Sequence, residues 1–317
     1  MTFTQKLKKE LSILPIDSRT AKSELSVFLR LNGLFQFSRS GNRIEIQTQN
    51  PASARRIYIL ISTTYHSDIE TNIEKSTNKN FKNLHSYSLF VSDNSERILN
   101  DLEIFPFSGQ SPVPSSFLRY RDQQRAFMRA AFLSAGSMND PVTKDYHLEI
   151  AASNKFLIEQ LSRMMNRKFF ALDAKTTDRR NKRMVYIKSS EHISRFLSVI
   201  GATSAMLEFE DSRIMSDMRN SANRLANADN ANVTRLTRAA QKQIESLKLL
   251  ERKGLLDKLP EKLKTVARLR LANPDAGLSD LADMIDDQKL TKSGINHRMR
   301  KLMEIAFENQ DPDQEKV

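Results

Sequence analysis

The first two-thirds of the chain contain an internal duplication, and this feature restricts the possible folds more than any other. Residues 23–33 read S-E-L-S-V-F-L-R-L-N-G and residues 125–136 read R-A-F-M-R-A-A-F-L-S-A-G, and both strings are typical of an apolar helix that ends in glycine. Gly33 and Gly136 are 103 positions apart (136 minus 33). A segment that recurs with the same following elements indicates two copies of one structural unit.

The same order of elements follows each glycine-ended helix. Period-two alternation predicts strands, and longer apolar stripes predict helices. In the first copy we expect strands at 34–38 and 43–48, a helix at 52–61, strands at 69–75 and 87–91, and a helix at 95–102. In the second copy we expect a strand at 146–151, a helix at 155–165, a hairpin from 170–175 and 183–188, and a helix at 191–200. We interpret each copy as αββαββα, with only one strand predicted between the first two helices of the second copy; the alternative is a coincidental α+β run.

Small side chains on both glycine-ended helices predict that these helices pack against each other. They are Ser26 in the first copy and Ala126, Ala130, Ala131 and Ser134 in the second. We therefore expect an α+β fold with pseudo-twofold symmetry and these two helices at its centre.

A second pattern, near the carboxyl end, predicts a helix-turn-helix. Leu278, Leu281, Ala282 and Ile285 repeat at helical spacing, with Ser279 as the expected cap. After a turn at 286–290, Thr291 is the expected cap of a second helix. Its buried stripe is predicted to be Ile295, Met299, Leu302 and Ala306.

The second of these helices is basic. Residues 288–301 contain five Lys or Arg and no Asp or Glu. Cations suit phosphates, and Asn or Arg side chains suit base edges in the major groove. The predicted DNA-binding residues are Ser279, Lys289, Thr291, Lys292, Ser293, Gly294, Asn296, His297, Arg298, Arg300 and Lys301. The alternative is a basic face that is only solvated.

Composition favours an anionic partner. The 317 residues include 50 Lys or Arg against 38 Asp or Glu, a net charge of +12, and nucleic acid is the commonest partner of such a chain. The absence of cysteine excludes disulfides and thiolate metal sites and fits the cytoplasm. Since apolar runs are short, we expect no membrane span. Because we expect the chain to bind DNA, we also expect it to associate with the nucleoid.

Several strings resemble known families. A helix that ends in an acidic residue plus glycine, followed by two hairpins, is the pattern of LAGLIDADG homing endonucleases. Together with the helix-turn-helix, the chain resembles the WhiA family, regulators of sporulation and cell division in Gram-positive bacteria. The more specific strings are S-E-L-S-V-F-L-R-L-N-G, Y-H-L-E-I, F-L-S-V-I-G-A, D-M-R-N-S-A-N-R-L-A-N and K-S-G-I-N-H-R-M-R-K-L.

The nuclease resemblance implies two carboxylates, one before each closing glycine, that hold divalent metal. The matching positions here are Asn32 and Ala135, an amide and a methyl group. The nearest carboxylates, Glu24 and Asp140, are displaced along the chain. Hard divalent cations need oxygen anions. We therefore expect no metal site, no cofactor and no enzymatic activity.

Other charged and polar clusters leave alternatives open. The basic groups at 119–129 (Arg119, Arg121, Arg125 and Arg129) and at 178–183 are either solvated charge or contacts for phosphates or a partner. Five asparagines at 220–232 indicate either a hinge or polar contacts. The five His are not paired at metal-ligand spacing.

The predicted organisation has five segments. They are an N-terminal helix at 1–20, a duplicated domain at 21–210 (copies at about 21–105 and 119–210), a helical linker at 211–255, a helix-turn-helix domain at 256–309 and a disordered tail at 310–317. A helix at 233–250, with Val233, Leu236, Ala240, Ile244 and Leu247 on its stripe, completes the linker.

These patterns predict a non-catalytic, sequence-specific regulator that binds double-stranded promoter DNA. The resemblance implies a role in cell division, chromosome segregation or sporulation, with another transcription factor or RNA polymerase as a further partner. The alternative is an interaction scaffold, or a nucleoid-associated division factor, whose DNA contacts are secondary.

Overall fold

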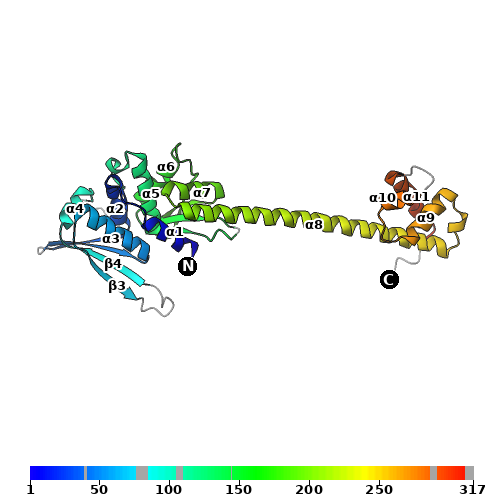
Figure 1. Cartoon of the computed structure of the whole chain (residues 1–317), viewed down its shortest axis with the longest axis horizontal. Coiled ribbons are helices and arrows are strands. Elements are labelled where there is room, and N and C mark those ends of the chain that lie inside the picture. Colours follow the sequence, from blue (N-terminus) through cyan, green and yellow to red (C-terminus); the bar gives the residue numbers. More distant parts are fainter. Residues whose placement is uncertain (39–40, 76–84, 105–109, 144, 286–290, 311–317) are drawn as a thin grey trace. The chain divides into compact units, whose positions relative to one another are not determined.

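The computed structural model describes residues 1–38, 41–75, 85–104, 110–143, 145–285 and 291–310 (Figure 1). The chain divides into two units, Met1–Asp217 and Met218–Val317. Each unit contains a buried apolar cluster of its own. Most of the predicted tail, 311–317, lies outside the described residues.

The first copy of the repeat is a four-stranded antiparallel sheet with helices on one face. The strand order is β1-β2-β4-β3, so both predicted hairpins are confirmed. Ile44, Ile46 and Leu89 are buried beneath the helices. The elements are α2 (Ser18–Asn32), β1 (Gly33–Ser38), β2 (Gly41–Thr48), α3 (Pro51–Tyr65), β3 (Glu70–Lys75), β4 (His85–Val91) and α4 (Ser95–Asp101) (Figure 1).

The second copy repeats this topology, with the strand order β5-β6-β8-β7. Gly33 pairs with Ile46 in the first sheet, and Gly136 pairs with Ile150 in the second. The equivalent register confirms the duplication. The elements are α5 (Arg121–Ala135), β5 (Gly136–Met138), β6 (Leu148–Ala152), α6 (Lys155–Met165), β7 (Lys175–Arg179), β8 (Lys182–Ile187) and α7 (Ser190–Ile200).

Two strands of the second copy differ from the sequence prediction: β5 was not predicted, and the strand expected at 170–175 was placed wrongly. Residues 170–174 do not form a strand, and β7 starts at Lys175 and includes part of the expected charged turn. The Asn166 side chain is hydrogen-bonded to both backbone groups of Ala174, at 2.7 Å each. Ala171 and Asp173 have positive φ values, which a strand does not allow. These contacts hold the segment as a loop.

The central helices α2 and α5 pack closely, as predicted. Ser26, Ala126, Ala130 and Ala131 are fully buried between them and their neighbours. Each helix continues directly into the first strand of its sheet through the closing glycine. The carboxyl ends of both helices are therefore adjacent to sheet edges.

Two short elements complete the first unit. Helix α1 (Phe3–Ser12) buries Phe3, Leu7 and Leu11 in the shared core, so an N-terminal helix is present but is shorter than the predicted 1–20. The hydroxyl of Thr4 donates to the carbonyl of Met138 at 2.8 Å and ties α1 to β5. The 3₁₀ turn η2 (Ser115–Leu118) precedes α5.

Helix α8 (Thr203–Arg252) includes the five asparagines, so a hinge or turn at 220–232 is wrong. The residues of this stretch are exposed. The predicted stripe is buried only at its end: Leu247 is fully buried, whereas Val233 and Leu236 are 61% and 62% exposed.

The second unit is a small helical cluster around Leu247, Val266, Leu281 and Met299, all fully buried. The elements that follow α8 are η3 (Leu256–Lys258), α9 (Glu261–Ala272), α10 (Leu278–Asp283) and α11 (Lys292–Glu308) (Figure 1). The predicted helix-turn-helix pair is α10 and α11. The turn between them, 286–290, lies outside the described residues and includes the predicted site residue Lys289.

Candidate nucleic-acid interface and central pocket

Helix α11 has the two faces that the sequence predicted. Ile295, Met299, Leu302 and Ala306 are buried against α9 and α10. Thr291 caps the helix, because its side-chain oxygen accepts a hydrogen bond from the Gly294 N–H at 3.3 Å. The helix is therefore fixed by one apolar stripe, and its opposite face is free of the unit's own core.

The outer face of α11 carries cations and hydrogen-bonding groups. Lys292, Ser293, His297, Arg300 and Lys301 are exposed. Gly294, Asn296 and Arg298 are half-buried at the flanks. Every predicted site residue of α11 is thus at least partly exposed to solvent.

The first helix of the pair begins differently from the prediction. Gly277, rather than Ser279, is the cap residue of α10, and Ser279 lies inside the helix with an exposed side chain. The Asp280 carboxylate accepts a hydrogen bond from the Gly277 N–H at 2.9 Å. An aspartate in the first turn also suits the positive end of the helix dipole, so Asp280 replaces Ser279 in fixing the helix start.

Arg270 fixes the loop that leads into α10. It is 2% exposed, and one of its terminal nitrogens donates to the carbonyl of Ala276 at 2.6 Å and more weakly to Asn273 and Pro274. Burial lowers the pKa of Arg270. The guanidinium satisfies carbonyls that would otherwise be buried without a partner.

We expect Arg270→Met to destabilise the second unit by about 2 kcal/mol, because several loop carbonyls lose a charged donor. The measurement is urea unfolding of the full chain, with hydrogen exchange followed in peptides of α11. Arg268→Met is the matched control: Arg268 pairs with Asp257 at the surface and should contribute under about 1 kcal/mol. Equal effects of the two substitutions would contradict this role.

A pocket of about 610 Å³ opens at the carboxyl ends of α2 and α5. Asn32 and Ala135, the residues that precede the two closing glycines, both line it. The Asn32 amide donates to the carbonyl of Gln47 at 3.0 Å. The described residues that line the pocket are Lys8, Asn32, Gln47, Thr48, Gln49, Asn50, Ser86, Ser134, Ala135, Gly136 and Lys182.

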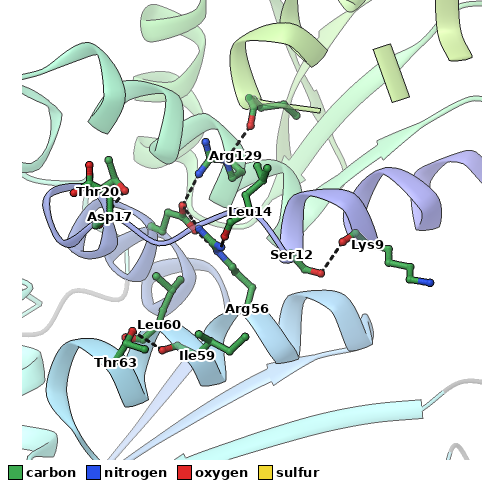
Figure 2. A network of polar contacts seen from close by, with 12 residues as sticks. Lys9, Ser12, Leu14, Asp17, Thr20, Arg56, Ile59, Leu60, Thr63 and Arg129 are labelled. Atoms are coloured by element: carbon green, nitrogen blue, oxygen red, sulfur yellow. Dashed lines mark hydrogen bonds and ion pairs between the residues drawn. The ribbon is translucent and has the colours of Figure 1, made fainter. Parts of the chain in front are cut away.

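The carboxylate of Glu24 lies in the protein core and not in this pocket. Glu24 accepts two hydrogen bonds from Arg56 of α3, at 2.9 Å each, and one from Arg129 of α5, also at 2.9 Å. Arg56 also donates to the carbonyl of Leu14. Figure 2 shows the two arginines converging from different helices, with Leu14 beside Arg56. This ion cluster joins the two copies of the repeat.

Asp140, the other nearby carboxylate, lies in an exposed loop and accepts from the Val142 N–H at 3.0 Å. Among the described residues that line the pocket none is a carboxylate, and two are lysines. Divalent metal binding requires anionic oxygen ligands. The side chains of this pocket therefore do not fit a divalent cation. The described part of the chain also has no cluster of three or more His, Asp or Glu side chains that would suit a metal.

Lys8 was not predicted as a site residue, yet it brings a buried cation to the pocket. Its side chain is 7% exposed and lies over the Phe132 ring, 5.8 Å from the centroid. Burial lowers the pKa of Lys8 from 10.5 to about 8. In the sequence Lys8 is one of several lysines on an amphipathic helix, and no local signal distinguishes it from solvated Lys9.

The basic clusters noted in the sequence are partly neutralised. Arg129 is held by Glu24, and Arg183 is paired with Asp178 and Glu159. Arg121 stacks on the Phe169 ring at 3.7 Å. These contacts give structural roles to three of the arginines. In the part of the chain that the structure describes, no helix is long and apolar enough to cross a membrane.

Comparison with known proteins agrees with this architecture. Three family models match the chain: the WhiA N-terminal LAGLIDADG-like domain at 18–105, the WhiA LAGLIDADG-like domain at 124–219 and the WhiA C-terminal HTH domain at 222–306. The crystal structure of full-length WhiA from Thermatoga maritima is similar, with a TM-score of 0.61 and 26% identity, and the match covers 98% of this chain and 100% of that one.

Curated relatives are closer in sequence. The "probable cell division protein WhiA" of Oenococcus oeni is 59% identical over 309 residues, which is 97% of this chain and 98% of the relative. Its counterpart in Lacticaseibacillus casei is 43% identical, over 98% of this chain and 99% of the relative.

A duplicated LAGLIDADG-like fold followed by a helix-turn-helix unit defines the class of the protein. Within that class, the chain belongs to the WhiA family.

Proposed function

We propose that this protein is a non-catalytic, sequence-specific DNA-binding regulator that reads promoter DNA with α11. The observation that supports this most is the exposed face of α11, where His297, Arg300 and Lys301 lie opposite the buried stripe. Lys292, the first residue of the helix, is also exposed. A helix fixed on one side and cationic on the other suits the major groove.

The side chains of α11 divide into two groups by chemistry. Arg298, Arg300 and Lys301 suit phosphate contacts, which supply affinity without sequence information. Lys292, Ser293, Asn296 and His297 suit base edges. Ser293 and His297 are fully on the exposed face, whereas Asn296 is at its flank. From this flank, the Asn296 side chain would contact the edge of a base that lies beside the helix rather than directly beneath it.

The absence of nuclease activity is part of this proposal. Asn32 and Ala135 provide no anionic ligand at the ends of the central helices, and Glu24 is engaged by Arg56 and Arg129. Losing metal ligands removes most of the stabilisation of a phosphoryl transition state. Pure protein is expected to leave supercoiled DNA intact in Mg²⁺ or Mn²⁺, and nicking of that DNA would contradict the proposal.

The relatives' names support a role in cell division, in which the protein would associate with the nucleoid at division or segregation promoters. Genome-wide immunoprecipitation of the full chain tests this and supplies the target sequence. Enrichment without a shared sequence motif would favour the alternative, an interaction scaffold with secondary DNA contacts. Co-purification of RNA polymerase or another transcription factor tests for further partners.

On a target from that experiment, Asn296→Ala is expected to cost roughly 1–3 kcal/mol of binding and to relax specificity at one base pair. Lys301→Ala is expected to weaken binding to all DNA sequences alike. It should also reduce the salt slope, the slope of log binding constant against log salt concentration, by about 1. Fluorescence anisotropy on matched and mutated duplexes measures both. Lys262→Ala, an exposed lysine of α9, is the control for loss of charge. Unchanged isotherms for both α11 variants would reject α11 as the reading helix.

A further inference from the structure

We propose that the pocket between the central helices is a phosphate-binding site in which the ammonium group of Lys8 supplies the positive charge. The ligand is a phosphate group, carried either by the DNA backbone or by a free nucleotide-sized molecule. The site lies in the first unit, so it is separate from the reading helix α11.

Lys8 is a buried cation without a partner. Its side chain is 7% exposed and lines the pocket. Among the described residues its ammonium group has no ion pair or hydrogen bond, and it has one cation–π contact, with the Phe132 ring. Buried lysines are almost always paired, because an unpaired ammonium loses its hydration without compensation. Three N–H donors therefore remain for a ligand.

Two further buried polar atoms in the same pocket have no partner. They are the hydroxyl oxygen of Ser134 and the side-chain carbonyl oxygen of Asn32. The Ser134 hydroxyl can donate to a phosphate oxygen. The Asn32 oxygen can accept from a hydroxyl or amine of the same ligand or from a bound water. Lys182, an exposed lysine on β8, adds a second cation at the rim.

The pocket has the size and charge of a site for a phosphorylated ligand. Its volume of about 610 Å³ falls in the range of small-molecule sites. The lining includes two lysines and, among its described residues, no carboxylate. A phosphate would thus meet two cations and a hydroxyl donor without a competing anion in the lining.

The competing explanation is that Lys8 only balances the partial negative charge at the carboxyl ends of α2 and α5. Each helix end carries about half an elementary charge. That role would account for a cation near the pocket, but it would leave the Ser134 hydroxyl and the ammonium donors without acceptors. The two explanations differ in one observable, the binding of an added phosphate compound.

The test is isothermal titration calorimetry of the full chain with inorganic pyrophosphate in phosphate-free buffer. We expect Lys8→Met to weaken pyrophosphate binding at least tenfold. Lys9→Met, which removes an exposed lysine from the next position of the same helix, should change it less than twofold. Absence of binding to the wild-type chain, or equal binding to both variants, would overturn the proposal.

A second measurement does not depend on the folding of any variant. Acetylation of the wild-type lysines, followed by peptide mass spectrometry, reports their accessibility one by one. We expect pyrophosphate to slow the acetylation of Lys8 at least fivefold and to leave Lys9 unchanged. Equal rates for Lys8 with and without pyrophosphate would contradict the site even if Lys8→Met failed to fold.

The source of the phosphate is distinguished with duplex DNA of random sequence. If the DNA backbone occupies the pocket, Lys8→Met should lower the salt slope of non-specific binding by about 0.9 relative to Lys9→Met, as expected for one lost phosphate contact. An unchanged slope together with lost pyrophosphate binding assigns the pocket to a free phosphorylated ligand. Both variants keep α11 intact, so neither result depends on the reading helix.

Discussion

Replacement of Glu24 by glutamine is expected to lower the free energy of unfolding of the first unit by about 3–5 kcal/mol. Glu24 is fully buried and is the single carboxylate shared by Arg56 and Arg129, which are 1% and 15% exposed at their side chains. The substitution preserves the shape of the side chain but removes its charge. Two guanidinium groups would then remain in the core without a counter-charge, and the hydration that they lost on folding would not be replaced.

Urea unfolding of the full chain, with hydrogen exchange of α2 and α5 peptides, measures this effect. Asp122→Asn is the matched control, since Asp122 and Arg19 form a surface pair at 3.6 Å that should contribute under about 1 kcal/mol. A loss of less than about 1 kcal/mol in Glu24→Gln would show that the cluster does not hold the two copies together.

The pairing itself can be separated from the loss of charge by a double-mutant cycle. Arg129→Met alone removes one cation and leaves Glu24 paired with Arg56. In the Glu24→Gln background the same change removes an uncompensated cation, so it should recover part of the lost stability. Additive effects of the two substitutions would mean that Glu24 and Arg129 act independently.

Lys8→Met is expected to make the folded protein more stable at pH 7, by up to about 3 kcal/mol. The pKa of Lys8 falls from 10.5 to about 8 because burial disfavours the ammonium form. A tenfold change in proton affinity corresponds to about 1.4 kcal/mol, which gives this magnitude. The charged lysine carries its full cost below pH 8, where both the folded and the unfolded chain bind the proton.

The pH dependence has a defined sign. Between pH 8 and 10.5 the unfolded chain binds the Lys8 proton more tightly than the folded chain, so the stability of the wild-type protein rises with pH through this window. The advantage of Lys8→Met should therefore shrink above pH 8 and vanish near pH 10.5. Chemical unfolding at pH 7, 9 and 10.5 in phosphate-free buffer measures the free energy of unfolding of both chains. The difference between the variant and the wild-type chain removes the contribution of the other lysines. A constant difference between them would contradict the pKa assignment.

If replacing a pocket residue stabilises the protein, the natural residue was retained for a reason other than stability. Natural proteins retain destabilising charges mainly where function uses them. If Lys8→Met stabilises the fold and also abolishes pyrophosphate binding, the two results together assign the buried ammonium to ligand recognition. If the stabilised variant still binds pyrophosphate, phosphate binding does not explain why the protein retains a lysine that lowers its folding stability.

Much of the fold was predictable because its periodicities are local. Alternation at 34–38 and 43–48 identified the β1–β2 hairpin, and the stripe from Ile295 to Ala306 identified the buried face of α11. The error at 170–174 arose because the Asn166 side chain forms hydrogen bonds with a segment eight residues away, and its contacts override strand propensity.

The residues of the candidate sites also divide into those that local spacing predicts and those that depend on tertiary contacts. The exposed cations of α11 follow from helical spacing alone, whereas the start of α10 depends on a carboxylate contact that spacing does not reveal. Lys8 was missed because its burial results from tertiary packing, in which its ammonium group lies over the ring of Phe132, 124 positions away (132 minus 8). Glu24, Arg56 and Arg129 likewise come from three separate helices, and no sequence spacing marks them as a cluster.

The two helix-closing glycines determine which positions at the ends of the central helices can vary. A side chain at Gly33 would overlap the carbonyl of Leu29, and one at Gly136 would overlap the ring and carbonyl of Phe132. Close packing at Gly33 and Gly136 therefore requires glycine, whereas the preceding positions, Asn32 and Ala135, are half-buried. Substitutions at those two positions can thus change the chemistry of the pocket while the glycines keep the ends of the central helices in place.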